Sequence, residues 1–208
     1  MAILSATLQA AFLAAASNVL AQLITASRTK TSLAIDWIPV LQFTIFSIVN
    51  TPPNYLWQDY LESAFPARPR RRHASSEPAR RPSLSLINTL AKFVLDQTVG
   101  AAVNTVLFSF FVHGLQDAMA PAPRITSLSA ALAYSTGPGA IDLQRVHAAR
   151  LVAIARAEFW PIINAGMRFW PLVSLLNFTL VKTVHARNLV GALAGVAWGV
   201  YMSIVAAR

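Results

Sequence analysis

The chain has 208 residues, of which 55% are hydrophobic and only 12% are charged, and its mean hydropathy is +0.51. Soluble domains carry about 25% charged residues, so this composition argues against a soluble globular protein and indicates a membrane protein. The chain has no cysteine, which excludes a disulfide, a thiolate metal site and a cysteine nucleophile.

Basic residues are concentrated in one segment. The net charge is +9, and six of the seventeen basic residues lie between Arg68 and Arg81, among Pro and Ser residues. Such a tract between apolar segments is typical of a topogenic loop or of a contact for anionic lipid head groups. We predict a flexible loop at about 66–83, with anionic lipid head groups as its partner. A basic nucleic-acid-binding protein is the remote alternative, and we expect no nucleic-acid partner.

The first apolar stretch, from Ile3 to Ala26, is rich in Ala and Leu. It has neither the basic leader of a secretory signal nor the Arg-rich pattern of a mitochondrial presequence, so we expect it to be the first membrane span. Asn18 and Gln22 lie four residues apart on one helical face. Their amides should face other helices rather than lipid.

A second apolar run extends from Trp37 to Leu56, after a candidate helix cap at Ser32 or Asp36. It contains the pair Pro52-Pro53. Proline removes a backbone donor and clashes with the preceding turn, so the pair predicts a kink or break near Asn50.

The third helical stretch, from Leu84 to Gln116, carries Lys92 and Asp96 at positions i and i+4. Such a pair can neutralise its charges locally. An unpaired carboxylate at the bilayer centre costs about 2.5 to 3.5 kcal/mol. We therefore expect Asp96 to lie near a membrane interface or to point inward at Lys92 or Arg168.

The middle of the chain is rich in Pro and Gly, and we predict an irregular segment at about 120–141. The following residues, Ile141 to Glu158, place apolar side chains near one helical face and basic ones largely elsewhere. This pattern predicts a short amphipathic helix at the membrane surface, and a helix packed on the soluble side of the bundle is the alternative.

The closing residues contain two apolar runs, Phe159 to Val181 and Asn188 to Val205, which are 23 and 18 residues long. Runs of this length cover a hydrocarbon layer of about 30 Å, so they predict a membrane hairpin. The last helix carries glycines spaced by four residues, which predict a packing seam within the bundle or between the protomers of a homo-oligomer. These glycines are Gly191, Gly195 and Gly199.

Several short motifs along the chain, in order, resemble the peroxisomal membrane protein 2 / Mpv-seventeen family of small organellar membrane proteins. The matching positions are Pro52, Trp57, Asp96, Gln97, Trp170, Pro171, Asn177, Phe178, Arg187, Trp198 and Tyr201. Leu61, Glu62 and Pro66 also fall at matching places. Three positions depart from the family pattern: Thr51 stands in place of Gly, Ser174 in place of Gln, and Lys182 in place of Pro.

The resemblance implies a single all-α membrane domain over residues 1–208, a bundle of four to five transmembrane helices plus the amphipathic helix. It implies a multi-pass protein of the lipid bilayer of an organelle, for which we favour the mitochondrial inner membrane over the peroxisomal membrane. Some relatives are described as pores, so we expect a small-solute channel or permeability factor. A non-conducting membrane scaffold is the alternative.

The sequence shows no catalytic motif. It has no phosphate-binding Gly-rich loop, no metalloprotease helix and no Gly-flanked nucleophilic Ser, and its four histidines lack ligand spacing. We therefore expect no enzyme activity, no cofactor and no metal site. The polar residues most suited to a solute path are Asp96, Asn104 and Arg168. The structural alternative is that Asp96 and Arg168 pair, or that Arg168 extends to the membrane surface.

Overall fold

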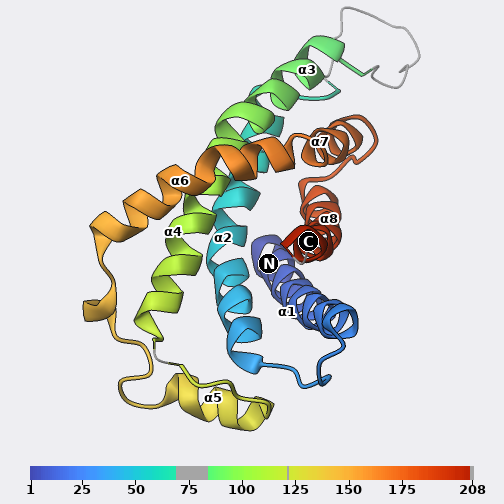
Figure 1. Ribbon diagram of the computed structural model, residues 1–208. Coiled ribbons are helices and arrows are strands. Elements are labelled where there is room, and N and C mark those ends of the chain that lie inside the picture. Colours follow the sequence, from blue (N-terminus) through green and yellow to red (C-terminus); the bar gives the residue numbers. More distant parts are fainter. Residues whose placement is uncertain (69–83, 121, 207–208) are drawn as a thin grey trace, which may run out of the picture.

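The computed structural model describes residues 1–68, 84–120 and 122–206, and within them every regular element is a helix (Figure 1). The loop predicted at about 66–83 therefore lies mostly outside the described residues, as does the basic tract beyond Arg68. The helices are α1 (Ala2–Thr29), α2 (Trp37–Ala64), α3 (Leu86–Leu95), α4 (Ala101–Ala118), α5 (Leu128–Thr136), α6 (Ala148–Gly166), α7 (Trp170–Thr179) and α8 (Val184–Ala206).

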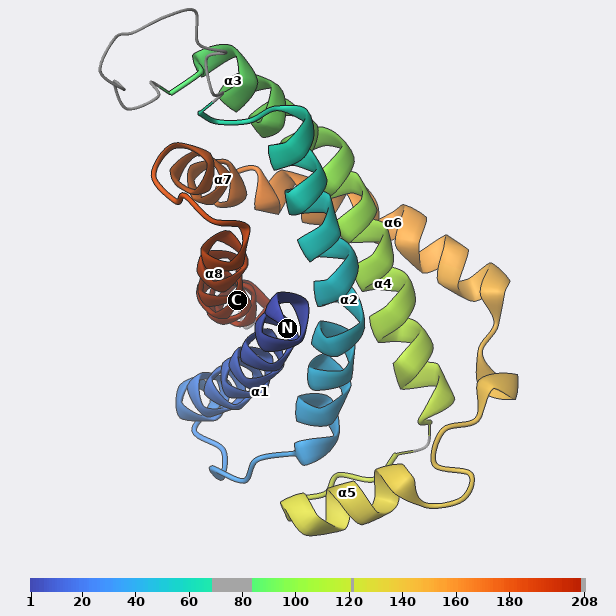
Figure 2. The same cartoon turned by 180° about the vertical axis from the view of Figure 1, so that it is seen from behind.

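The helices form a bundle in which α2 lies between two groups. α1 packs against both α2 and α8, and α4 packs against α2 and α6. Figures 1 and 2 show α6 crossing α4 on the side away from α1, and α7 lying beside the α3 end of the long green helix. A small apolar core of Ile38, Met119 and Ala131 joins α2, α4 and α5 at the opposite end.

The predicted first helix is confirmed, and its polar pair faces its neighbours. Gln22 Nε2 donates to Asn18 Oδ1 at 2.9 Å and to the Asp36 carbonyl at 2.8 Å, and Gln22 Oε1 accepts from the Asp36 N–H. Asp36 in turn caps α2, since its Oδ1 accepts from the Ile38 N–H. The two amides thus fix the joint between α1 and α2, as expected from their spacing.

Of the kink or break predicted near Asn50, the break is wrong, because α2 runs without interruption through Pro52 and Pro53. Prolines leave carbonyls of the preceding turn without a donor. The carbonyls without a helical donor are those of Ile48 and Val49, four residues before each proline. The neighbouring Ser47 carbonyl accepts from the Thr51 hydroxyl at 2.6 Å.

The third predicted helix is confirmed and is one continuous helix from Leu86 to Ala118. Between α3 and α4 it contains a π-helical turn, η1 (Asp96–Gly100). A π turn widens the helix by one residue and is often found at functional sites. It begins at the acidic residue of the apolar stretch.

The irregular segment predicted at about 120–141 contains a helix, so that prediction is wrong. α5 occupies nine residues whose neighbouring prolines and glycines all lie outside it. Its first turn is capped by Ser127, whose Oγ accepts from the Ala130 N–H at 3.5 Å. The Ala- and Leu-rich sequence between Ser127 and Gly137 is therefore long enough for two helical turns.

The closing hairpin also differs from the prediction. The amphipathic segment starts with a short 3-10 turn, η2 (Leu143–Arg145), and α6 then runs from Ala148 to Gly166. The run predicted as one span from Phe159 to Val181 is therefore divided between the end of α6 and the ten-residue α7. Pro171 explains the division, because its missing N–H is tolerated in the first turn of α7, whereas in a continuous helix it would leave the Met167 carbonyl without a donor.

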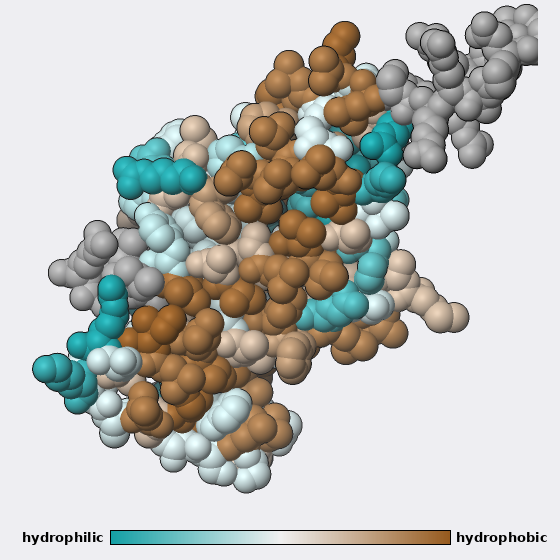
Figure 3. All heavy atoms as spheres, turned by 90° about the vertical axis from the view of Figure 1, so that its right-hand side faces the viewer, coloured by the Kyte–Doolittle hydropathy of each residue, from teal (hydrophilic) through white to brown (hydrophobic). Residues whose placement is uncertain are grey.

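The surface is strongly apolar. Two helices in the described part of the chain, α1 and Leu86–Ala118, are long and apolar enough to cross a membrane. In each, only 22% of the most apolar 18-residue stretch is buried inside the molecule. Core helices of soluble proteins are mostly buried, so these faces are suited to lipid. Figure 3 shows apolar side chains over most of one face of the molecule.

Candidate functional site

Three charged side chains meet where the end of α2 approaches α3 and the start of α8. Lys92 Nζ and Arg187 Nη1 each lie 2.6 Å from the same oxygen, Glu62 Oε2. The side chains of Lys92 and Arg187 are 0% and 1% exposed, whereas that of Glu62 is 28% exposed. We call Glu62, Lys92 and Arg187 the ion-pair cluster. It holds two buried cations against one carboxylate.

An aromatic ring from α7 completes this cluster. The centroid of Phe178 lies 5.2 Å from Lys92 Nζ and 5.5 Å from Arg187 Cζ. The face of an aromatic ring attracts cations, and the attraction is stronger where water is excluded. Phe178 is itself buried. The ring therefore balances part of the positive charge that Glu62 leaves uncompensated.

The cluster also closes the turn between α7 and α8. Arg187 Nε donates to the carbonyls of Asn177 at 3.2 Å and Val181 at 3.1 Å. Asn177 Nδ2 donates back to the Arg187 carbonyl at 3.3 Å. These bonds satisfy carbonyls at the end of α7 that have no helical donor. Arg187 thus joins α8, α7 and α2 through one side chain.

The same contacts set the acidity of Glu62. Burial raises the pKa of its carboxyl, but hydrogen bonds from Lys92, from the Ala67 N–H and from Arg187 outweigh burial, so the pKa lies below its ordinary value. Glu62 is therefore a stable carboxylate at neutral pH.

A second polar group surrounds Asp96 in the π turn. Its Oδ1 accepts from Gln58 Nε2 at 2.9 Å and from the Trp57 indole at 3.3 Å, and its Oδ2 accepts from Ser174 Oγ at 2.8 Å and Gln97 Nε2 at 3.3 Å. We call these five residues the Asp96 cluster. All four donors are neutral, so the carboxylate is solvated by the protein, and no cation among the described residues pairs with it.

Gly100, one turn after Asp96, lets α2 come this close. A Cβ atom at Gly100 would lie 2.9 Å from Trp57 Nε1, which is shorter than real Cβ contacts. The glycine therefore leaves room for the indole that binds Asp96.

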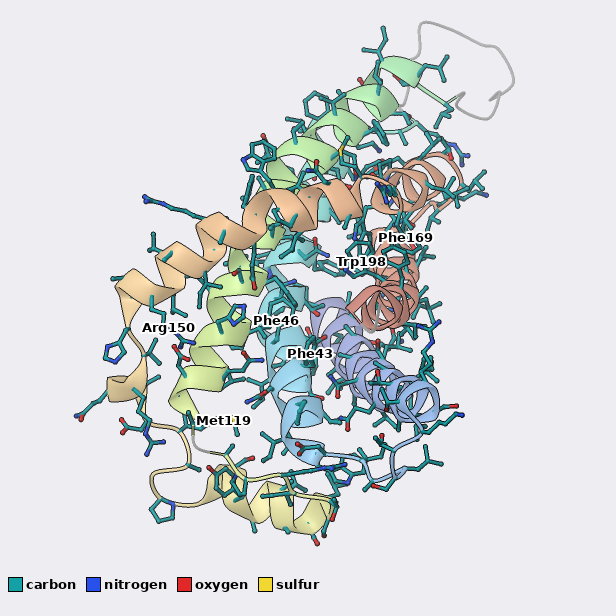
Figure 4. The ribbon with its side chains drawn as sticks, viewed as in Figure 1. Phe43, Phe46, Met119, Arg150, Phe169 and Trp198 are labelled. Atoms are coloured by element: carbon teal, nitrogen blue, oxygen red, sulfur yellow. The ribbon has the colours of Figure 1, made fainter. Side chains whose placement is uncertain are left out.

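Most residues that carry the family resemblance contact one another in space. Trp57 and Gln97 each donate a hydrogen bond to the Asp96 carboxylate, and Asn177 donates one to the Arg187 carbonyl. On α7 and α8, the Trp198 ring lies 6.1 Å from Trp170 and 5.5 Å from Tyr201. Figure 4 shows Trp198 beside Phe169, with which it stacks at 5.9 Å. These residues therefore gather in three groups, and Arg187 of one group also contacts Glu62, 125 positions away in the chain.

The comparisons with known proteins support the family resemblance. A family model described as the Mpv17 / PMP22 family matches residues 143–203. The chain is 23% identical to PXMP2/4 family protein 3 of Dictyostelium discoideum over 175 residues, which cover 84% of this chain and 70% of the relative. It is 24% identical to Mpv17-like protein of Bos taurus over 149 residues, which cover 72% of this chain and 52% of that relative. The family resemblance found in the sequence is therefore confirmed, since the chain is similar to Mpv17 / PMP22 family proteins.

This similarity to the Mpv17 / PMP22 family indicates a protein of an organelle membrane. The matched residues comprise η2, α6, α7 and most of α8, which together bring Ser174, Phe178 and Arg187 to the two clusters. No solved structure matches the chain.

The partners expected for Asp96 are wrong. Lys92 pairs with Glu62 and not with Asp96, four residues away. Arg168 is exposed, and none of the ion pairs among the described residues joins it to Asp96. Helical spacing brings Lys92 and Asp96 near each other, but the end of α2 presents Glu62 to Lys92. A contact between distant segments thus replaces the local pair.

Two residues of the predicted polar path, Asp96 and Asn104, contact the same helix, α2. Asn104 Oδ1 accepts from Asn50 Nδ2 on α2 at 3.3 Å, and its own Nδ2 donates to the Gly100 carbonyl at 3.0 Å. Asp96 binds the α2 side chains Trp57 and Gln58. Both residues therefore lie on the seam between α2 and the long helix, and Arg168 lies elsewhere.

Only one member of the glycine ladder makes a close approach. A Cβ at Gly199 would lie 2.6 Å from Ser17 Oγ of α1, whereas one at Gly191 or Gly195 would meet no described atom within 4 Å. The seam within the bundle is thus confined to Gly199. The other two glycines leave the surface of α8 open.

A third polar group, between α4 and α6, was missed by the sequence reasoning. Glu158 accepts from Ser109 Oγ at 2.8 Å and lies 3.0 Å from His113 Nε2. Ser109 and His113 lie four apart on α4, a spacing that places them on one helical face and is the signal that sequence offered. Nearby, Arg150 of α6 pairs with Asp117 of α4 (Figure 4). No group of three metal-binding side chains occurs within the described residues.

Proposed function

We propose that this Mpv17 / PMP22 family member is a non-enzymatic channel or permeability factor for small solutes in an organelle membrane. The mitochondrial inner membrane is the favoured location and the peroxisomal membrane the alternative. In the proposal four to five helices span the bilayer. α2 has 28 residues and α8 has 23, which at about 1.5 Å per residue exceeds a hydrocarbon layer of about 30 Å. The four proposed spans are thus α1, α2, Leu86–Ala118 and α8, and α6 is either the fifth span or the surface helix.

One observation supports a solute path, the polar seam between α2 and the long helix. Asp96 and Asn104 face α2 there, and eight residues of helix separate them by about 12 Å. Two α2 atoms on this seam, Asn50 Oδ1 and Gln58 Oε1, are buried and have no hydrogen-bond partner among the described residues. Buried polar atoms normally have partners, so such a pair suits a region that admits water or a polar solute.

The charge of Asp96 predicts the ion preference of the path. Because its four donors are neutral, the carboxylate should attract cations. At about 7 Å in a water-filled path a unit negative charge lowers the energy of a cation by about 0.6 kcal/mol and raises that of an anion equally, which is roughly sevenfold in their permeability ratio. We expect purified protein in planar bilayers to conduct, and Asp96→Asn to lower the cation-to-anion permeability ratio by that factor. Asp59→Asn is the matched control, since it removes the same charge from an exposed position on α2.

The same recording separates the proposal from its alternative, a non-conducting scaffold. That alternative is favoured by Gly191 and Gly195, whose open face on α8 leaves room for a partner helix. Bilayers that stay silent although the protein is incorporated would refute the channel and favour the scaffold. Equal selectivity in the Asp96→Asn and Asp59→Asn variants would remove Asp96 from the path.

A further inference from the structure

A small cavity lies beside the ion-pair cluster, at the end of α2 and next to the turn between α7 and α8. Its volume is about 100 Å³, which is roughly three water molecules by liquid volume. The charged residues that line it are Glu62, Arg68, Lys182 and Arg187. A cavity of this size accommodates one charged group and not a whole metabolite.

The charge around this cavity is strongly positive. Three basic side chains line it against one acidic side chain. The acidic one, Glu62, is already bound by the two buried cations of the ion-pair cluster, one of which is Lys92 behind the cavity wall. Within the described residues, one positive charge of this cluster therefore has no anion, and such a charge is costly in the protein interior unless it is compensated.

The geometry of the cavity is partly fixed and partly adaptable. Arg187 is held in place by Glu62 and by the carbonyls of Asn177 and Val181. Arg68 and Lys182 are exposed at the mouth, where their side chains can reach a bound group. A preorganised guanidinium with mobile basic groups around it is the arrangement that binds phosphate oxygens well.

We propose that this cavity binds a phosphate-type oxyanion, with Arg187 at its base and Arg68 and Lys182 at its mouth. The oxyanion comes from a free phosphate or from the head group of an anionic lipid, because both present the same oxygens. The mouth lies beyond the end of α2 and at the turn after α7, as expected for a site at head-group level. The site does not depend on conduction through the polar seam.

Thermal unfolding of the purified full-length protein tests the site. In the first arm, inorganic phosphate is titrated into protein in neutral detergent, with chloride at matched ionic strength as reference. In the second arm, nanodiscs of phosphatidylcholine with and without phosphatidic acid are compared. We expect a saturable rise in Tm in at least one arm. A rise in both arms identifies a free-phosphate site, and a rise with phosphatidic acid alone identifies a head-group site.

Substitutions locate the binding at the cavity. A basic side chain near a membrane surface is worth about fivefold in anion affinity, so Lys182→Gln and Arg68→Gln should each weaken the apparent affinity by about fivefold. Both positions are exposed, so these variants are expected to fold. Lys30→Gln is the matched control at an exposed position after α1. The proposal is overturned if neither phosphate nor phosphatidic acid raises Tm, or if all three variants bind like the wild type.

Discussion

At the scale of single residues, the ion-pair cluster is the most consequential feature of the molecule. Lys92 and Arg187 are both buried and share the one carboxylate oxygen of Glu62. Removing one member of a buried ion pair typically costs about 3 to 5 kcal/mol, because the remaining charge loses its partner. Here the loss of Glu62 would leave two cations facing each other. The cluster therefore joins α2, α3 and α8 only while Glu62 is ionised.

We predict that Glu62→Gln lowers the free energy of unfolding by about 3 kcal/mol or more, for this reason. The double variant Glu62→Gln/Lys92→Met should recover part of the loss, since methionine fills the space of lysine without its charge. Unfolding in mixed micelles at neutral pH measures both variants. Asp59→Asn, which neutralises an exposed carboxylate three residues earlier in α2, should be nearly silent.

The pH dependence gives this prediction a second readout. The folded pKa of Glu62 is lowered, so its contribution to stability is present above the unfolded pKa and is lost as the pH falls through the folded pKa. Glutamine mimics the protonated acid. The difference in stability between the wild type and Glu62→Gln should therefore shrink as the pH falls from about 6 to about 3. A difference that stays constant over this range would show that Glu62 acts through packing and not through charge.

At the scale of elements, apolar runs predicted the helices well where the signals were local. α1, α2 and the long helix lie where composition placed them, and Asp36 caps α2 as a sequence-local rule requires. α5 was missed because the prolines and glycines around it hid a short capped helix. The prediction of one continuous span from Phe159 to Val181 was wrong, because it relied on hydropathy and ignored the break that Pro171 imposes.

The candidate site was likewise predictable only where the signal in the sequence was local. Asp96 was predicted as part of a polar path because it is an acid in an apolar run, and Arg187 was predicted only as a position of the family motif. The identity of their partners was not predictable, since Glu62 and Arg187 are 125 residues apart and meet only after the helices pack. Sequence spacing favoured Lys92 as a partner of Asp96, and the approach of α2 decided otherwise.

The π turn offers a test at this scale. We predict that Gly100→Ala destabilises the protein by about 1 to 3 kcal/mol, because its Cβ would lie 2.9 Å from the Trp57 indole and force it away from Asp96. Gly114→Ala in the same continuous helix is the matched control. Its Cβ would lie 3.5 Å from Leu151 Cδ1, an ordinary contact. Alanine should there be neutral or stabilise by up to about 1 kcal/mol.

Thermal unfolding of both glycine variants measures this contrast. Adding Trp57→Phe to Gly100→Ala should reduce the cost of the alanine, since the smaller ring leaves room for the Cβ atom. If Gly100→Ala and Gly114→Ala behave alike, or if Trp57→Phe brings no relief, the close approach of α2 to the π turn is not what Gly100 provides.

At the scale of the whole molecule, the distribution of polarity is the reverse of a soluble protein. Ionic and amide groups meet between the helices, while leucines and valines, with Phe12, cover the outside of α1 and the long helix. Figure 3 shows one face of the molecule, on which apolar side chains predominate. Only 22% of the apolar stretch of each helix is buried, so packing within the chain leaves most of that stretch uncovered. In water this surface would drive aggregation, and in a bilayer it is solvated by lipid.

This distribution distinguishes a membrane span from an exposed soluble helix by a single substitution. Phe12, near the middle of α1, is 74% exposed, and Leu33, in the link to α2, is 67% exposed. A lysine costs about 2.5 to 3.5 kcal/mol at the centre of a membrane span and little on a solvated surface. We predict that the wild type and Leu33→Lys sediment with mitochondria and stay in the membrane pellet after alkaline carbonate extraction, whereas Phe12→Lys is largely released or degraded. Equal retention of the two variants would place the Phe12 face outside the lipid. Release of the wild type would contradict membrane insertion altogether. Sedimentation with peroxisomes would assign the protein to the alternative organelle.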